Sequence, residues 1–355
     1  LQSGTVNGSI VVAAKNSGTT SVTKDDGVAV AIPADYVWKN NVMTKLWTVT
    51  FDSGGGDEVA SVIVLDGQKL TVPAAITKAA DENGVYTFSA WLLGETEYDF
   101  KAPVTSDITL TAEWDSVDSV AKIGTVYFAT LVDAVKAAAS GATIELTKSC
   151  SGDGIGLFVN PSEGTPVKDL VIDFAGYTYT VSGNAVGSNG TQNQGFHIEQ
   201  GCTVVLKNGT VTSTADSGVK MLVQNYCDLT VENMYLDGTN IGSGRYTLSN
   251  NCGDVVIDGS TIVAPENGRA FDAYGYASYT SVSVTVKGDS KIIGIIEVDS
   301  QDGTHAIAVD LQAGDFSDAV LSVTAAGYAK SEVESAAGLL DAPAGFEWVG
   351  STLTK

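Results

Sequence analysis

A repeat of about 25 residues in the middle of the chain constrains the fold more than any other feature. Cys202, Cys227 and Cys252 recur at this constant spacing. A fixed period of about 20–50 residues is typical of a solenoid, whose repeats bury a core only by stacking on one another. Within each repeat aliphatic residues alternate with polar ones, as at Val204 and Leu206, so each coil contributes strands. The pattern predicts an all-β fold, a right-handed parallel β-helix.

The third coil departs from this period by a single residue. The step along the chain from Leu229 to Val255 is one residue longer than the step from Cys227 to Cys252. We therefore expect a one-residue bulge in the third coil.

Asparagines also recur along the repeat. Asn208 and Asn233 are predicted to point inward and to form a ladder of side-chain amides, which stabilises stacked parallel strands. Because of the extra residue in the third coil, Asp258 either joins this ladder or aligns with Lys207 and Glu232.

The balance of charge excludes several classes of partner. The chain has 42 acidic and 19 basic residues and a formal net charge of −23. Such a chain repels phosphates and anionic membrane surfaces, so nucleic acids are not expected as partners. Polymers of uronic acids are disfavoured as well, unless a cation bridges the charges. No apolar run is long enough to cross a membrane, so direct membrane insertion is not expected.

The cysteines are interpreted as buried core residues. In-register neighbours on a parallel ladder lie about 4.8 Å apart, which is within the Cα range of a disulfide. A stack of small buried thiols is nevertheless the favoured interpretation, because free cysteine behaves as a compact hydrophobe. A metal site is disfavoured, since no Cys-x-x-Cys pair or adjacent histidine accompanies the cysteines. We expect no cofactor.

Composition and pattern divide the chain into four predicted parts. The first is a β-rich arm or small module, the second a small sheet module, the third a capped parallel β-helix and the fourth a C-terminal cap. Their predicted ranges are 1–45, 46–115, 116–310 and 311–355.

The second part resembles the Listeria–Bacteroides repeat, a β-grasp-like module of bacterial surface proteins related to internalin B-repeats. The resemblance is carried by Thr48–Asp52, Tyr86–Trp91, Tyr98–Phe100, Pro103–Val104 and Ile108–Trp114. The turn AADENGVY is longer than is usual in this family. The resemblance implies a spacer or adhesive module, and its Trp91 and Trp114 are expected in the core rather than at a ligand.

The only helix that the pattern predicts begins after Thr130. Thr130 can act as the N-cap, and Asp133 completes a pair that resembles a capping box. Gly141 is expected to end the helix. This helix and the following GATIEL resemble the opening of pectate-lyase-like β-helix proteins, in which the helix is a structural cap.

The C-terminal residues are predicted to close the other end of the β-helix. Their GDFS and GYA pieces resemble a unit that often follows β-helices in surface proteins of gut bacteria. Phe346 and Trp348 are expected to pack over the last coil.

The sequence gives little support for catalysis. Glycosidases need two carboxylates across the scissile bond, and no such pair stands out. Asp173 and Glu232 are expected to point outward with Lys207 between them, as a mutually paired surface. His197, which we place level with Leu222 and Thr247, and His305 lack the flanking residues of known sites and are expected to be packed or on the surface. No catalytic and no metal-binding residue is assigned.

One chemically rich segment interrupts the rhythm of the coils between residues 262 and 284. Its arginine, aspartate and tyrosines could stack on sugar rings and bond their hydroxyls. The alternative is a corner of the solenoid whose tyrosines cover the core. About one coil earlier, Arg245 and Tyr246 form a second Arg–Tyr pair that stacking could bring alongside this segment. The candidate ligand-binding residues are Arg269, Asp272, Tyr274, Tyr276 and Tyr279.

Together these features predict a secreted or surface-displayed protein without enzymatic activity, acting as an adhesin or as a structural or glycan-binding module. A glycan or a host-surface receptor is the expected partner. One alternative is a phage fibre, spike or head decoration on the virion surface, in which residues 1–45 would dock and the β-helix would form a homotrimer. A polysaccharide lyase or glycoside hydrolase is a second alternative, and a passive spacer is a third.

Overall fold

The computed structural model describes residues 22–26, 30–188 and 190–355. These residues fall into two compact units, which divide between Val117 and Asp118, except that Ala80–Val85 cluster with the second unit. The predicted strand SIVVAAK lies outside the described residues, as does most of the predicted N-terminal arm. No helix among the described residues is long and apolar enough to cross a membrane.

The first unit is a small sheet of six strands. Strands β2 and β6 pair in parallel, with Val49 opposite Ile108, and β1 and β3 both pair antiparallel with β2. Residues 47–113, which are all described, contain strands and no helix. The strands are β1 (Tyr36–Lys39), β2 (Val42–Asp52), β3 (Val62–Leu65), β4 (Val85–Leu93), β5 (Thr96–Glu97) and β6 (Ile108–Val117).

Aromatic residues form the core of this sheet. Trp91 is buried and meets Phe51 edge-on, with 5.0 Å between the ring centroids. Trp114 is partly buried and packs against Phe88. Both tryptophans therefore belong to the core, as predicted, because their rings supply the large apolar area that a small sheet needs.

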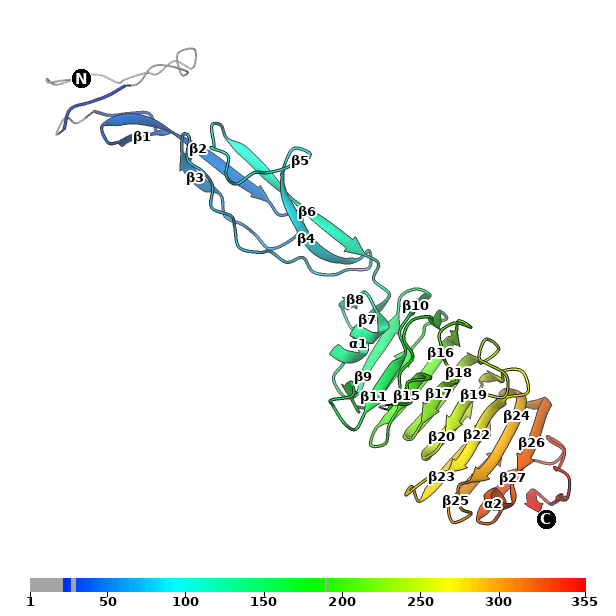
Figure 1. Ribbon diagram of the computed structural model, residues 1–355. Helices are drawn as coiled ribbons and strands as arrows, with labels where there is room; N and C mark the ends of the chain where they lie inside the picture. The colour runs from blue at the N-terminus through cyan, green and yellow to red at the C-terminus, as the bar shows by residue number, and fades with distance from the viewer. Residues whose placement is uncertain (1–21, 27–29, 189) are drawn as a thin grey trace. The chain divides into compact units, whose positions relative to one another are not determined.

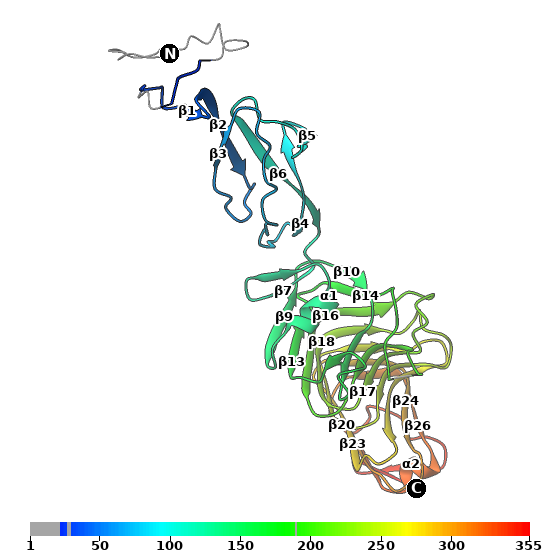
Figure 2. The same cartoon turned by 60° about the vertical axis from the view of Figure 1, so that its left-hand side comes forward.

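The second unit is a β-solenoid of about seven turns. Its strands form three ladders of parallel strands, and Figures 1 and 2 show them stacked along the solenoid. The first ladder holds β9 (Ala142–Leu146), β13 (Leu170–Asp173), the start of β16 (Thr203–Ser213), the start of β18 (Asp228–Asp237), β20 (Gly253–Asp258), β23 (Ser281–Lys287), β25 (Ala306–Leu311) and β27 (Ser331–Ser335).

The other two ladders complete each turn. The second holds β10 (Cys150–Gly152), β14 (Thr178–Val181), the ends of β16 and β18, β21 (Thr261–Val263) and the starts of β24 (Lys291–Ser300) and β26 (Asp315–Val323). The third holds β11 (Ile155–Phe158), β15 (Gln194–Ile198), β17 (Met221–Asn225), β19 (Tyr246–Asn250), β22 (Arg269–Gly275) and the ends of β24 and β26.

The short elements lie mainly at the two ends of this unit. Parallel pairing continues beyond residue 310, since β25 pairs with β27 as far as Ser335. Phe346 and Trp348 are partly buried against the solenoid core. The short elements are β7 (Ala121–Ile123), β8 (Val126–Phe128), β12 (Thr165–Pro166), α2 (Ala325–Tyr328), β28 (Glu347–Val349) and β29 (Thr352–Thr354).

The predicted helix is α1 (Leu131–Ala137). The Thr130 side chain accepts a hydrogen bond from the Asp133 N–H, which confirms the predicted N-cap. The helix ends at Ala137 rather than near Gly141, because its C-cap residue Ala138 leaves helical geometry at ψ 132°. The Lys168 ammonium donates to the last carbonyls of the helix, which helps to satisfy that end.

The interior of the solenoid follows the predicted alternation. Cys202 and Cys227 are buried free thiols, and Cys252 is partly buried. The asparagine ladder, however, lies elsewhere than predicted. Asn225 and Asn250 are fully buried, and the Asn225 Nδ2 donates to Asn250 Oδ1 over 3.0 Å.

The prediction that Asn208 and Asn233 point inward was wrong. Both residues adopt left-handed backbone geometry, with φ of 59° and 51°, and Asn233 is exposed. Asparagine tolerates this conformation better than other non-glycine residues, so its recurrence here marks a turn.

The extra residue of the third coil is confirmed. Asn225 pairs with Asn250, but Leu229 pairs with Val255, so the additional residue enters between these two pairs. Gly253 lies there with φ of 82°. As a result Asp258 aligns with Glu232 and not with Asn233.

Of the outward charges predicted to pair on the first ladder, Asp173 and Lys207 do so, whereas no ion pair of Glu232 is found among the described residues. The Lys207 ammonium lies 3.4 Å from the Asp173 carboxylate, and Lys287 lies 3.3 Å from Asp258. This face is therefore a solvated surface of mutually paired charges.

Candidate functional site

The third ladder carries a groove on its outer face. The groove has a volume of about 710 Å³, which is within the usual range for ligand pockets. Strands β15, β17, β19, β22 and β24 lie side by side beneath it (Figure 1). Residues outside these strands also line it, among them Ser188, Thr191, Tyr276 and Tyr279.

A polar column runs across the floor of the groove. Its members lie opposite one another in the register of neighbouring strands. In order along the stack they are His197, Gln224, Ser249, Asp272 and Glu297. All five side chains line the groove. The residue directly before each member of the column lies in the hydrophobic core, so the strand alternation places the column itself outside the core.

An aromatic row follows the groove. Tyr274 stacks on Tyr276 with 6.1 Å between centroids, and Tyr276 lies 6.3 Å from Tyr279. Tyr279 lies 5.4 Å from Tyr226, whose ring is 5.9 Å from that of His197. Tyr276 is 40% exposed, so at least one ring face of the row is open to a ligand.

Arg269 is held at the edge of the groove by Glu297. Its Nη2 lies 2.7 Å from Glu297 Oε1 and its Nε 3.0 Å from the same oxygen. The guanidinium also lies over the Tyr246 ring, at 5.3 Å from the centroid. The Tyr246 hydroxyl donates to Glu297 Oε2 over 3.4 Å. Arg269 therefore neutralises one carboxylate of an otherwise acidic groove.

Asp272 is the buried carboxyl group of the site. It is 4% exposed, and its two oxygens accept hydrogen bonds from the Asn250 N–H and the Ser249 hydroxyl, over 2.7 and 3.2 Å. Burial raises the pKa of Asp272 to about 8, and the neighbouring Glu297 carboxylate adds to the rise. Burial at this position therefore favours the neutral form of Asp272.

His197 uses both ring nitrogens in a hydrogen-bond network. Its Nδ1 lies 3.1 Å from Gln224 Oε1, and its Nε2 lies 3.3 Å from Glu199 Oε1 and 3.2 Å from the Ser188 hydroxyl. The Gln224 amide then donates to the Tyr226 hydroxyl. Burial raises the pKa of Tyr226 to about 12, so its hydroxyl stays protonated.

The structure brings the predicted ligand-binding residues together. Asp272, Tyr274, Tyr276 and Tyr279 line the groove, and Arg269 contacts it through Glu297. Of the Arg245–Tyr246 pair, Tyr246 lines the groove and lies opposite Arg269 in the strand register. The first part of the segment is β22, a strand of the third ladder, and its pairing with β24 shifts register between Arg269 and Phe271.

Two sequence interpretations of this region were wrong. His197 is level with Gln224 and Ser249, not with Leu222 and Thr247, and it is a bonded member of the groove. A carboxylate pair does stand out, since Asp272 and Glu297 are in register. The polar column was not evident from the sequence because successive turns on this face differ in length, which moves its members off the period of the cysteines.

The described residues give no indication of a metal centre: none of their histidine, cysteine, aspartate and glutamate side chains gather in threes around a possible ion position.

Residues 47–113 match the family model described as the Listeria-Bacteroides repeat domain. They form such a repeat. The repeat runs from within β2 to within β6 of the first unit and suggests a cell-surface protein. No curated protein and no solved structure matches the chain. The chain thus combines a surface-repeat domain with a β-solenoid that carries a polar, aromatic groove.

Proposed function

We propose that this protein acts at the cell surface and that its solenoid binds a carbohydrate in the groove. The aromatic row from His197 to Tyr274 carries the proposal, because tyrosine rings present flat apolar faces with hydroxyl groups at their edges. The polar column beside it supplies the hydrogen-bonding groups that sugar hydroxyls need. The repeat domain fits a role in presenting the solenoid, either as an adhesin or as a spacer.

The charges of the groove favour a neutral or cationic glycan. Glu199 and Asp299 face the groove, whereas Glu297 is neutralised by Arg269. Together with the net charge of −23, these carboxylates disfavour uronic acids and sialylated glycans. A host-surface glycan without acidic sugars is the expected partner.

Binding to a glycan panel tests this proposal. Tyr276→Ala should weaken the binding of a captured glycan roughly tenfold, since a lost ring contact of about 1.4 kcal/mol has that effect. Tyr235→Ala is the matched control, because Tyr235 is 43% exposed but lies outside the groove. The proposal fails if no glycan binds, or if both substitutions weaken binding equally.

A second candidate is glycoside hydrolysis, which the register of Asp272 and Glu297 favours. One carboxyl group has a raised pKa and the other is paired with Arg269, and glycosidases place an acid and a carboxylate in this way. It ranks second because Asp272 is almost fully buried and both its oxygens accept hydrogen bonds. Release of reducing ends from a neutral oligosaccharide, lost in Glu297→Gln, would support it.

We also propose that the solenoid is right-handed and that α1 closes its first turn. Parallel crossovers in one sheet are right-handed in about 98% of proteins. Leu131 and Val135 are buried in the same core as Ile144 of the first strand. Leu131→Asp should expose that end and cause association through the uncovered strand edge, which light scattering would detect. Lys136→Asp, on the exposed side of the helix, is the control.

A further inference from the structure

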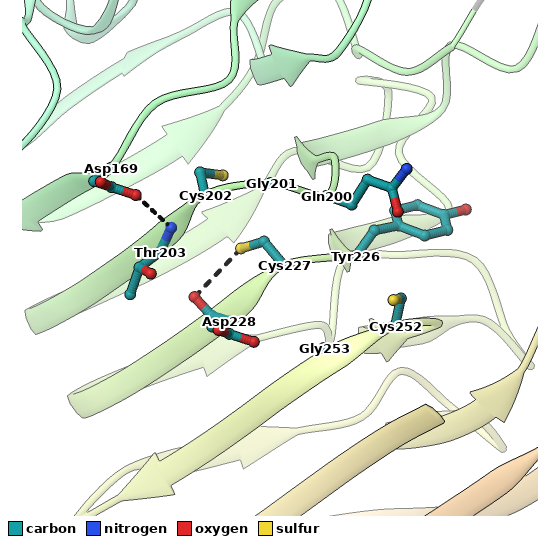
Figure 3. Close-up of a pocket in the computed structure, with 10 residues that line it drawn as sticks. All are labelled: Asp169, Gln200, Gly201, Cys202, Thr203, Tyr226, Cys227, Asp228, Cys252 and Gly253. Carbon is teal, nitrogen blue, oxygen red and sulfur yellow. Dashed lines mark hydrogen bonds between the residues drawn. The ribbon is translucent and has the colours of Figure 1, made fainter. Parts of the chain in front are cut away.

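A second pocket lies where the three cysteines of the repeat stack (Figure 3). It has a volume of about 340 Å³ and lies at the start of the first-ladder strands β16, β18 and β20. Cys202 is 8% exposed and Cys227 is 3% exposed, yet both contribute to the wall of this pocket. The pocket is separate from the groove, although Tyr226 lines both.

Two of the three thiols are placed to react with each other. Thr203 pairs with Asp228, so the preceding residues, Cys202 and Cys227, occupy equivalent positions in neighbouring coils. In-register Cα atoms on a parallel ladder lie about 4.8 Å apart, which is within the 4.4–6.8 Å range of disulfides. The Cys227 thiol itself donates to Asn225 Oδ1 and to the Asp228 carbonyl. The neighbouring Cys227 lowers the pKa of the Cys202 thiol, whereas Cys202 and burial raise that of Cys227, so Cys202 is the first of the two to ionise.

Cys252 lies next to a change of register. The extra residue at Gly253 changes the register directly after Cys252. Figure 3 shows the sulfurs of Cys202 and Cys227 close to each other and that of Cys252 further along the stack. The pair is therefore Cys202 with Cys227.

We propose that Cys202 and Cys227 form a reactive thiol pair, which small disulfide compounds entering the pocket convert into a disulfide between neighbouring coils. The Cys202 thiolate attacks one sulfur of the compound, forming a mixed disulfide and releasing one thiolate. Cys227, as its thiolate, then attacks the Cys202 sulfur and releases the second. The compound is reduced to two thiols, which take up the two protons that the cysteines lose.

The pocket selects the charge of the oxidant. Asp169 and Asp228 line it beside the cysteines. Their carboxylates repel an anionic disulfide and attract a cationic one. A cell-surface location, which the repeat domain suggests, is also where thiols meet oxidising conditions.

Mass spectrometry of the full chain tests the proposal. The reduced protein is exposed to cystamine, which is cationic, or to dithiodiglycolate, which is anionic, then alkylated and digested with trypsin. Cleavage after Lys168, Lys207, Lys220, Arg245 and Arg269 places the three cysteines in separate peptides. We expect a cross-link between peptides 169–207 and 221–245, formed about tenfold faster with cystamine.

Three variants separate the possible outcomes. Cys252→Ser should keep the cross-link, whereas Cys202→Ser should abolish it while its far-UV circular dichroism matches that of the parent chain. Cys150→Ser, outside the pocket, is the control and should also keep the cross-link. Alkylation of both Cys202 and Cys227 after prolonged exposure to cystamine, or a cross-link to Cys252 instead, would overturn the proposal.

Discussion

At the scale of single residues, the side chains on the neighbouring strand determine how readily a carboxyl group ionises. Asp272 and Asp258 are both aspartates on outer faces of the solenoid. Asp258 is partly exposed and pairs with the ammonium of Lys287, whereas Asp272 is buried next to the carboxylate of Glu297. The two environments differ because desolvation strongly disfavours the charged form at the buried Asp272.

The first prediction concerns the pH dependence of stability. The folded-state pKa of Asp272, about 8, lies above its unfolded value near 3.8, so the folded state binds more protons between these values. The free energy of unfolding should therefore fall as pH rises from 5 to 8, by up to about 1.4 kcal/mol per pH unit from this group. Asp272→Asn, a neutral isostere, should remove this slope.

Urea denaturation at pH 5, 6, 7 and 8 checks the prediction. The other titrating groups are common to both proteins, so the difference between the two curves isolates Asp272. Parallel curves for the parent chain and Asp272→Asn would show that Asp272 is ionised in the folded state throughout.

A second prediction concerns the buried amide ladder. The Asn225 Nδ2 donates to Asn250 Oδ1 and to the Cys227 carbonyl, over 3.0 and 2.7 Å. Asn225→Ala leaves these buried acceptors without this donor and should cost about 3 kcal/mol in the free energy of unfolding. Asn233→Gly should change it by less than about 1 kcal/mol, because glycine adopts the left-handed turn freely. Equal effects in chemical denaturation would contradict the assignment.

At the scale of elements, strands follow from alternation, and turns from a few residues with special backbone geometry. The bulge of the third coil depends on Gly253, whose φ is 82°. A Cβ atom there would lie 2.2 Å from the Cys227 carbonyl oxygen of the preceding coil. Glycine is thus required both by conformation and by the close stacking of coils.

The third prediction uses this close contact. Gly253→Ala should lower the free energy of unfolding by about 3 kcal/mol, through backbone strain and the clash with Cys227. Gly201→Ala is the matched control, since Gly201 has φ of 95° but nothing within 4 Å of an added Cβ. It should cost only about 1–2 kcal/mol. If the two variants have the same denaturation midpoint, the coils do not pack closely at Gly253.

At the scale of the whole molecule, the chain has two separate hydrophobic cores. One surrounds Trp91 in the small sheet, and the other runs through the solenoid, where Ile257 is fully buried. Their separation implies that each core can be weakened without the other.

The fourth prediction follows from these cores. Calorimetry should show two thermal transitions. Trp91→Ala should lower only one of them, and Ile257→Ala only the other, because each substitution leaves a cavity that costs about 2–5 kcal/mol in its own unit. A single transition that both substitutions lower would show that the two units unfold together.

The sequence by itself determined the local structure of this protein, that is, its strands, its repeat length, its helix cap and its bulge. The alternation of aliphatic residues, the cysteine period, the Thr130 cap and the extra residue near Gly253 were all readable, because each depends on residues close in sequence. The repeat domain was also recognisable, since its motifs span residues 47–113 almost completely.

Only the tertiary structure decided the groove. On the first ladder Leu206 pairs with Val231, at the same spacing along the chain as the cysteines. On the third ladder the step from His197 to its partner Gln224 is longer than this spacing, and the step from Ser249 to Asp272 is shorter. Turns of unequal length join the three faces, so the period of one face does not place the residues of another. The site at Asp272 and Glu297 exists because stacking, rather than spacing, brings its side chains together.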